Sequence, residues 1–149
     1  MTVNPLEAHV GYWLRFVSNH VSHAFRRKIE ARGVTVAEWV VLRELFDRAD
    51  AAPSEIAERL GLTRGAISKL VDRLEAKALL ARQAGGPDRR YQSIALTAEG
   101  RALVPELAAV ADRNDAEFFG GLDAPTRATI LRAMQDIVRR HGLRAIPIE

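Results

Sequence analysis

The chain has 149 residues, a length that suits one compact domain or a domain with an extension. Of these residues 48% are apolar, as is ordinary for a globular protein, and the formal net charge is +3. It contains no cysteine, which excludes a disulfide scaffold, a thiolate zinc site and a cysteine-based peroxide sensor. No apolar run approaches the roughly 18 residues of a membrane-spanning helix, and the first residues lack a signal-peptide pattern. We therefore expect a cytoplasmic protein that does not contact a membrane.

The first thirty residues are predicted to form one long amphipathic helix, because apolar residues recur along them three or four positions apart. Gly33 is suited to end this helix, since glycine tolerates the left-handed cap conformation. Thr35 and Glu38 have the spacing of a capping box, so a second helix is expected to begin after Thr35.

Two further helices joined by a tight turn are predicted next. Pro53 fits the first turn of a short helix that ends at Leu60, Gly61 supplies the turn, and Thr63 is placed to cap the following helix. The apolar residues of that following helix fall on one face and are expected to be buried: Ile67, Leu70, Val71 and Leu74.

A β-hairpin and two long helices complete the chain. Residues 79–83 and 91–96 are predicted strands, and the Gly-Gly-Pro-Asp run at 85–88 has the composition of a turn. Thr97 and Asp123 are each placed to cap one of the two long helices.

These elements predict a mainly α fold of the α+β class. Residues 35–97 form a winged helix-turn-helix domain with a two-stranded wing, and residues 1–34 and 98–149 form a helical region around it. The helices at the two ends have wide apolar stripes but no core of their own. We expect these long helices to pack against those of a second chain, forming a homodimer.

The residue types in the two central helices are typical of a DNA-binding helix-turn-helix. Ala57, Gly61 and Ile67 follow one another at offsets of four and six, which gives a small residue, a turn residue and a buried branched residue where the motif needs them. Residues 64–90 carry seven cations and three anions, so the positive charge is concentrated on this motif. Together these features predict a protein that binds double-stranded DNA.

The helix at 63–77 is the predicted recognition helix, which lies in the major groove. Arg64 at its start can pair with guanine, Gly65 allows a close approach, and Ser68 can contact a base or a phosphate. Lys69 and Arg73 are expected at phosphates. The candidate DNA contacts in and before this helix are Ser54, Thr63, Arg64, Gly65, Ser68, Lys69 and Arg73.

The wing at 83–92 is the second predicted contact with DNA. Arg89 and Arg90 lie at or just after its turn, and arginine at the tip of a narrow β-ribbon can enter the minor groove. Asp88 is expected to orient a neighbouring arginine through a charge-assisted hydrogen bond.

Three runs of residues together resemble the MarR family of multiple-antibiotic-resistance-type regulators. The run DRRYQSIALT at 88–97 matches that family's D-x-R-x-x-x-x-x-L-T signature, LTRGAISKLVDRLEAKALLAR at 62–82 is similar to its recognition helix and first wing strand, and VTVAEWVVLREL at 34–45 is similar to its second helix. The resemblance implies a dimeric, ligand-responsive repressor that reads a pseudo-palindromic operator, with Arg90 as the minor-groove probe.

Two positions depart from the family's pattern. Ala78 stands where the family commonly has glycine, and an alanine in the left-handed conformation costs about 1–2 kcal/mol. Ala52 stands in place of the usual hydroxyl cap before Pro53, which weakens that helix start by about 1 kcal/mol.

The resemblance further implies an effector pocket between the long helices and the winged domain, which would take a small aromatic or anionic compound. The candidate lining residues are Trp13, Phe16, His20, Trp39 and Arg43. Trp13 could equally belong to the dimer core, and core packing is the favoured interpretation for Trp39.

The alternative to a DNA-binding regulator is a winged-helix module that binds protein, with an incidental basic face. An enzyme is disfavoured because no Ser-His-Asp set, paired carboxylates or phosphate loop is present in the sequence. His20 and His23 have a chelating spacing but no evident third ligand, so neither a metal nor a cofactor is expected. Lys77 and Arg82 are interpreted as solvated cations.

Overall fold

The structure is a computed structural model that describes residues 1–84 and 92–148. These residues form six α-helices, one 3-10 turn and a two-stranded antiparallel sheet, which confirms the predicted fold class. In chain order the elements are η1 (Leu6–Ala8), α1 (Val10–Glu30), α2 (Val36–Phe46), α3 (Pro53–Leu60), α4 (Arg64–Ala76), β1 (Leu80–Ala84), β2 (Gln92–Leu96), α5 (Ala98–Phe119) and α6 (Ala124–Arg140).

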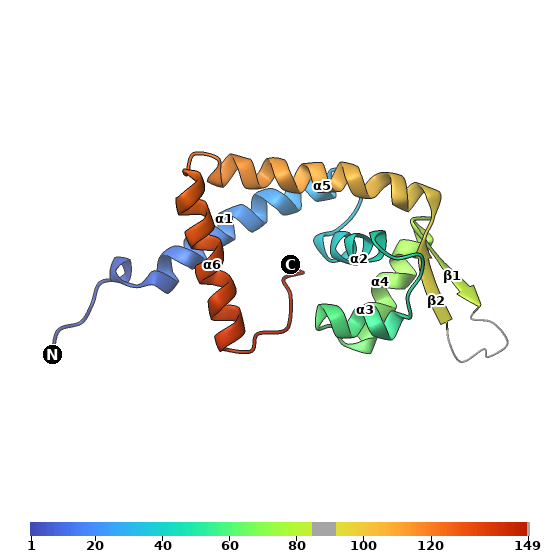
Figure 1. The fold of residues 1–149 in the computed structure, drawn as a ribbon, viewed down its shortest axis with the longest axis horizontal. Coiled ribbons are helices and arrows are strands. Elements are labelled where there is room, and N and C mark those ends of the chain that lie inside the picture. Colours follow the sequence, from blue (N-terminus) through green and yellow to red (C-terminus); the bar gives the residue numbers. More distant parts are fainter. Residues whose placement is uncertain (85–91, 149) are drawn as a thin grey trace.

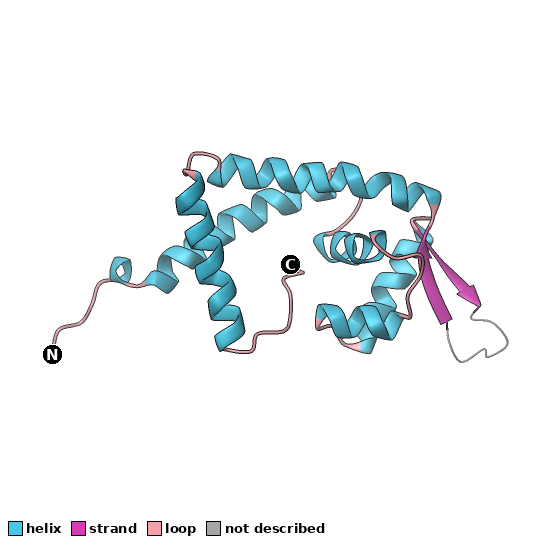
Figure 2. Ribbon diagram, viewed as in Figure 1, coloured by secondary structure: helices cyan, strands magenta, loops and turns pink. Residues whose placement is uncertain are grey.

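The helices divide into two regions that share α5 (Figure 1). At one end, α2, α3 and α4 pack together beside the β1–β2 hairpin, whose strands are drawn in magenta in Figure 2. From the hairpin, α5 runs along one side of the molecule with α1 beside it, and α6 turns away at the far end. No helix among the described residues is both long and apolar enough to cross a lipid bilayer.

The first helix is shorter than the sequence predicts. It begins at Val10, and the preceding turn η1 is separated from it by the extended residue His9, with φ −98° and ψ 125°. The Trp13 indole donates a hydrogen bond to the carbonyl oxygen of Glu7 (2.9 Å). This side-chain bond links α1 to η1 across the break in the helix.

The winged unit is built around one hydrophobic core, and its helix starts are capped as predicted. Thr35 and Glu38 form a reciprocal capping box, with both bonds at 3.1 Å, and Thr63 accepts a hydrogen bond from the backbone of Ala66 (3.1 Å). The predicted stripe of α4 is buried, and its core neighbours include Ile56, Leu60, Leu80 and Ile94. Consequently, the opposite face of α4 is exposed.

An ion pair between Lys77 and the buried Glu38 fixes the end of α4, so Lys77 is partly exposed but is not the free solvated cation that the sequence suggests. The Lys77 ammonium donates to the carbonyl oxygen of Gly33 and to the Glu38 Oε1, both at 2.9 Å. It also lies 2.9 Å from Glu38 Oε2, but without hydrogen-bond geometry. Since only 1% of Glu38 is exposed, its carboxylate depends on this partner for neutralisation. Ala78 follows in the left-handed conformation, with φ 60°.

The segment after α6 returns to the winged unit at the turn between α3 and α4. Its Ile146 packs against the core, and the Ile146 N–H points to the carbonyl oxygen of Leu60 at 3.5 Å. Gly61 lies in this turn with φ 68°, and a Cβ there would come within 2.8 Å of the Arg144 carbonyl oxygen. Glycine is therefore required at position 61 both by the backbone conformation and by the close approach of the C-terminal segment.

Candidate nucleic-acid interface

A groove of about 230 Å³ lies between the start of α3, the exposed face of α4 and the hairpin. The fold brings Ser54, Arg64 and Ser68, three of the predicted DNA contacts, together in this groove. Arg82 and Gln92, from the two strands, also line it. The groove thus joins the predicted recognition helix to the base of the wing.

The exposed face of α4 carries three cations that make no ion pair with another described residue. These are Arg64, Lys69 and Arg73, and all three are exposed to solvent. A guanidinium or ammonium without a protein partner is available for a phosphate or a base edge. This face therefore has the charge and the accessibility that a DNA-binding helix requires.

Two small residues at the start of α4, Thr63 and Gly65, differ in whether the protein itself uses their side chains. The Thr63 hydroxyl oxygen is used as the helix cap, so its remaining capacity is to donate its own hydrogen. At Gly65 an added Cβ would meet only the Thr63 hydroxyl, at 4.0 Å, so nothing within the described protein requires glycine there. The absence of a side chain at position 65 leaves the surface of α4 open to a close neighbour.

Sequence reasoning missed the role of Arg82. This β1 residue donates hydrogen bonds to Asp72 (2.6 Å) and Glu75 (2.7 Å) on α4, so it is paired and not a free solvated cation. The hydrogen bond that Arg82 donates to Asp72, with the nearby charge of Glu75, raises the pKa of the Arg82 guanidinium above its ordinary value. The ten-residue separation of Arg82 and Asp72 gives no local signal, because the pair forms only when the hairpin folds against α4.

The wing residues Asp88, Arg89 and Arg90 lie outside the described residues. The strands on either side are described, and they pair antiparallel with Leu80 opposite Leu96 and Gln83 opposite Ser93. The hairpin therefore has the two-stranded form that the sequence predicts for the wing.

A second surface of interest lies at the far end from the wing and is apolar. Here α1, the end of α5 and α6 enclose an open groove of about 640 Å³. Its larger apolar lining residues are Val10, Trp13, Leu14, Val17, Val21, Phe118, Phe119, Leu122, Ile130 and Met134. No residue of α6 is buried, so the apolar stripe of this helix is exposed along its length.

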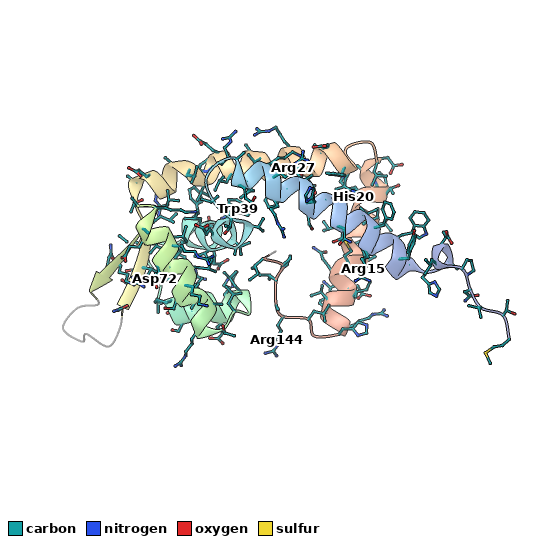
Figure 3. All side chains as sticks on the ribbon, turned by 180° about the vertical axis from the view of Figure 1, so that it is seen from behind. Arg15, His20, Arg27, Trp39, Asp72 and Arg144 are labelled. Carbon is teal, nitrogen blue, oxygen red and sulfur yellow. The ribbon has the colours of Figure 1, made fainter. Side chains whose placement is uncertain are left out.

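The predicted effector residues fall into two sets. Along α1, the rings of Trp13 and Phe16 are 6.3 Å apart and those of Phe16 and His20 are 5.1 Å apart. On α2, Trp39 is half-buried against the core, and Arg43 pairs with Asp47 at 2.9 Å. Figure 3 shows His20 and Trp39 on these two different helices. Of these five candidates, the apolar groove includes only Trp13.

Comparison with known proteins agrees with this architecture. A family model described as MarR family matches residues 32–90. One similar structure is that of Bordetella bronchiseptica BpsR, whose DNA binding is regulated by 6-hydroxynicotinic acid. It is 27% identical and matches with a TM-score of 0.78 over 91% of this chain and 97% of that one.

Two further structures extend the comparison. CouR from Rhodococcus jostii RHA1, bound to p-coumaroyl-CoA, is 27% identical with a TM-score of 0.77 over 97% of this chain and 99% of that one. A mutant MarR from E. coli complexed with operator DNA is 22% identical with a TM-score of 0.77, over 87% and 93% of the two chains, and shares the fold. The family model identifies residues 32–90 as a MarR-family winged helix-turn-helix, and these near full-length matches show that the whole chain has the fold of MarR-type winged-helix regulators.

Proposed function

We propose that this protein is a cytoplasmic, ligand-responsive repressor that binds a pseudo-palindromic operator as a homodimer and has no catalytic activity. The observation that carries the proposal is the exposed face of α4, where Arg64, Lys69 and Arg73 are accessible beside a groove that continues to the wing. BpsR and the operator-bound MarR, which share this fold, are both described as DNA-binding proteins. A protein-binding module would not need three exposed cations on this helix that make no ion pair with another described residue.

The residues have separate roles in this proposal. Arg64, at the N-terminal end of α4, reads a base edge in the major groove, with Ser68 one turn further along. Lys69 and Arg73 bind phosphates, as do Ser54 and the Thr63 hydroxyl, and these contacts set the register. The wing residues enter the minor groove, a role that rests on the sequence signature alone.

Salt-dependent binding to the DNA flanking the protein's own gene tests this proposal. The logarithm of the binding constant should fall steeply with the logarithm of salt concentration, with a slope of about −0.9 per phosphate contact. Lys69→Ala should reduce the magnitude of the slope by about one contact, while Arg64→Ala should mainly relax base preference. Arg132→Ala, which removes a cation on α6, is the control and should leave both properties unchanged. A shallow slope with no loss in the Lys69 variant would favour the protein-binding alternative.

In the proposed homodimer, a second copy of this chain packs against the apolar groove formed by α1, α5 and α6. A single chain leaves large apolar residues exposed on all three helices, and a symmetric partner would bury the same surface on both chains. Two recognition helices would then lie about 34–36 Å apart, one helical turn of DNA, and footprinting should show two half-sites. Protection of one isolated half-site would contradict this geometry.

A small aromatic or anionic effector is the proposed signal, bound near Trp13, Phe16 and His20 on α1 and Trp39 and Arg43 on α2. Two proteins of the same fold support this proposal: the DNA binding of BpsR is regulated by 6-hydroxynicotinic acid, an aromatic acid, and CouR binds p-coumaroyl-CoA, an aromatic acyl-CoA.

Titration of tryptophan fluorescence with a panel of aromatic acids tests the effector proposal. Trp13→Phe and Trp39→Phe variants assign the change to one helix, because the chain has two tryptophans. The absence of a saturable change across the panel would count against this site.

A further inference from the structure

The cleft between the recognition helix and the wing contains a charged cluster whose composition is unfavourable for DNA binding. Asp72 follows Ser68 by one helical turn, so these two residues lie on the same exposed face of α4. Glu75 follows Asp72 by three residues and continues that face. Two carboxylates are thus carried on the helix that is proposed to enter the major groove, and 64% and 43% of their side chains are exposed.

The geometry of the proposed complex brings DNA phosphates over this cleft. With α4 in the major groove and the wing in the neighbouring minor groove, the sugar-phosphate strand that separates the two grooves must pass between helix and wing. Arg82 lines the groove at this position together with Arg64 and Gln92. Free carboxylates there would face like charges, which lowers affinity.

Arg82 is placed to prevent this repulsion. Its two terminal nitrogens bond to the two different carboxylates, one at 2.6 Å and the other at 2.7 Å, so a single guanidinium spans both. The Arg82 side chain is 32% exposed, less than either partner. The cluster has one net negative charge with Arg82 present and would have two without it.

We propose that Arg82 is a positioning residue for DNA binding, which acts by holding and neutralising Asp72 and Glu75 so that α4 can approach the phosphates. In this role Arg82 acts through the two carboxylates and not as a phosphate ligand, since each of its terminal nitrogens already donates a hydrogen bond to one of them. This inference rests on the proposed DNA-binding function and extends it to a residue from the wing strand.

A mutant cycle separates this role from direct phosphate contact. Arg82→Ala is compared in the native protein and in a protein carrying Asp72→Asn and Glu75→Gln, with operator affinity measured over a range of salt concentrations. In the native background the change should weaken binding about tenfold, because two carboxylates are released towards DNA. In the neutralised background the same change should cost less than about threefold and leave the salt slope unchanged.

The controls exclude a general loss of folding or charge. Arg82→Lys keeps the positive charge and should retain most of the affinity. Arg140→Ala breaks an ion pair with Asp136 on α6 and should not affect operator binding. Thermal unfolding of each variant reports whether the fold is retained, and the Arg82→Lys variant remains informative if Arg82→Ala unfolds.

The outcomes distinguish this inference from the proposed function. An equal loss from Arg82→Ala in both backgrounds, with a slope lower by about 0.9, would make Arg82 a phosphate ligand and overturn the inference. No loss in the native background would also overturn it. If the unaltered protein shows no salt-dependent DNA binding, the proposed function fails and the inference fails with it.

Discussion

The winged unit and the long end helices have similar amphipathic sequences, yet they reach burial in different ways. Among the described residues, every large apolar side chain that remains strongly exposed lies outside residues 35–97. The α4 stripe is almost completely buried within its own chain, whereas the α6 stripe has no buried residue. An apolar stripe therefore predicts burial, but the identity of the covering surface depends on whether other elements of the same chain can reach it.

The largest expected effect is on the exposed stripe of α6. Met134→Glu places a charge in the apolar groove and should convert the dimer into a monomer with strongly reduced operator binding, because an unpaired charge cannot be buried in the interface. Light scattering after size-exclusion chromatography measures the mass. Gln135→Glu adds the same charge outside the groove and should remain dimeric. If the Met134→Glu variant remained dimeric, the α6 stripe would not be the surface that a second chain covers.

In the winged unit, loss of a buried partner should lower stability without changing the oligomeric state. Lys77→Met leaves the Glu38 carboxylate buried beside only the Thr35 backbone N–H and should reduce the free energy of unfolding by about 1–3 kcal/mol. Urea unfolding measures the loss. The double variant with Glu38→Gln should recover part of it, since the unpaired charge is gone. Additive losses from the two changes would show that the pair is not coupled.

The sequence predicted the parts of the winged unit that depend on neighbouring residues. The capping residues Thr35, Thr63, Thr97 and Asp123 all act as predicted, because a cap and its helix are within four residues of each other. Pairs between distant segments were not predictable in the same way. The bond from Lys77 to Glu38 spans 39 positions and depends on how α4 crosses α2.

The candidate site was predicted to a similar extent. Spacing on one helix placed Arg64 and Ser68 correctly on an exposed face, since helical geometry fixes that relationship. The participation of Arg82 and Gln92 in the same groove depends on the angle between the hairpin and α4, for which the sequence contains no short-range signal. The effector candidates on α1 and α2 remain a prediction, because the sequence contains no short-range signal for how these two helices lie relative to each other.

A smaller effect is expected at the departure from glycine after α4. Ala78→Gly should raise the free energy of unfolding by about 0.5–1 kcal/mol, because relief of the left-handed alanine exceeds the added chain entropy of glycine. The midpoint of urea unfolding reports this gain. Ala76→Gly, two residues earlier and within the helix, is the matched control and should destabilise the protein instead. Destabilisation by both changes would mean that Ala78 is not strained.

The smallest expected effect concerns the cap of α6. Asp123 accepts a hydrogen bond from the backbone N–H of Thr126 (2.7 Å), and the Thr126 side chain together with this N–H lowers the pKa of the Asp123 carboxyl. A lowered pKa in the folded state stabilises the helix above the ordinary value near 4, and this contribution is lost as the pH falls.

Dimer dissociation measured between about pH 6 and pH 3 should therefore increase slightly more in the native protein than in Asp123→Asn, which keeps the cap but does not titrate. Identical pH dependence of dimer dissociation in the two proteins would show that ionisation of the Asp123 cap does not contribute to the stability of the dimer.

The continuity of α5 has a mechanical consequence. Its 22 residues run from the end of the hairpin to the apolar groove, a length of about 33 Å. If α5 behaves as a rigid lever, a tilt of about 5° at its dimer end displaces the wing end by about 3 Å, close to the rise of about 3.4 Å per base pair along the DNA helix axis. In the proposed ligand-responsive repressor, a rotation of this helix by a few degrees would shift each recognition helix by about one base pair, which is enough to prevent both half-sites from being read at once.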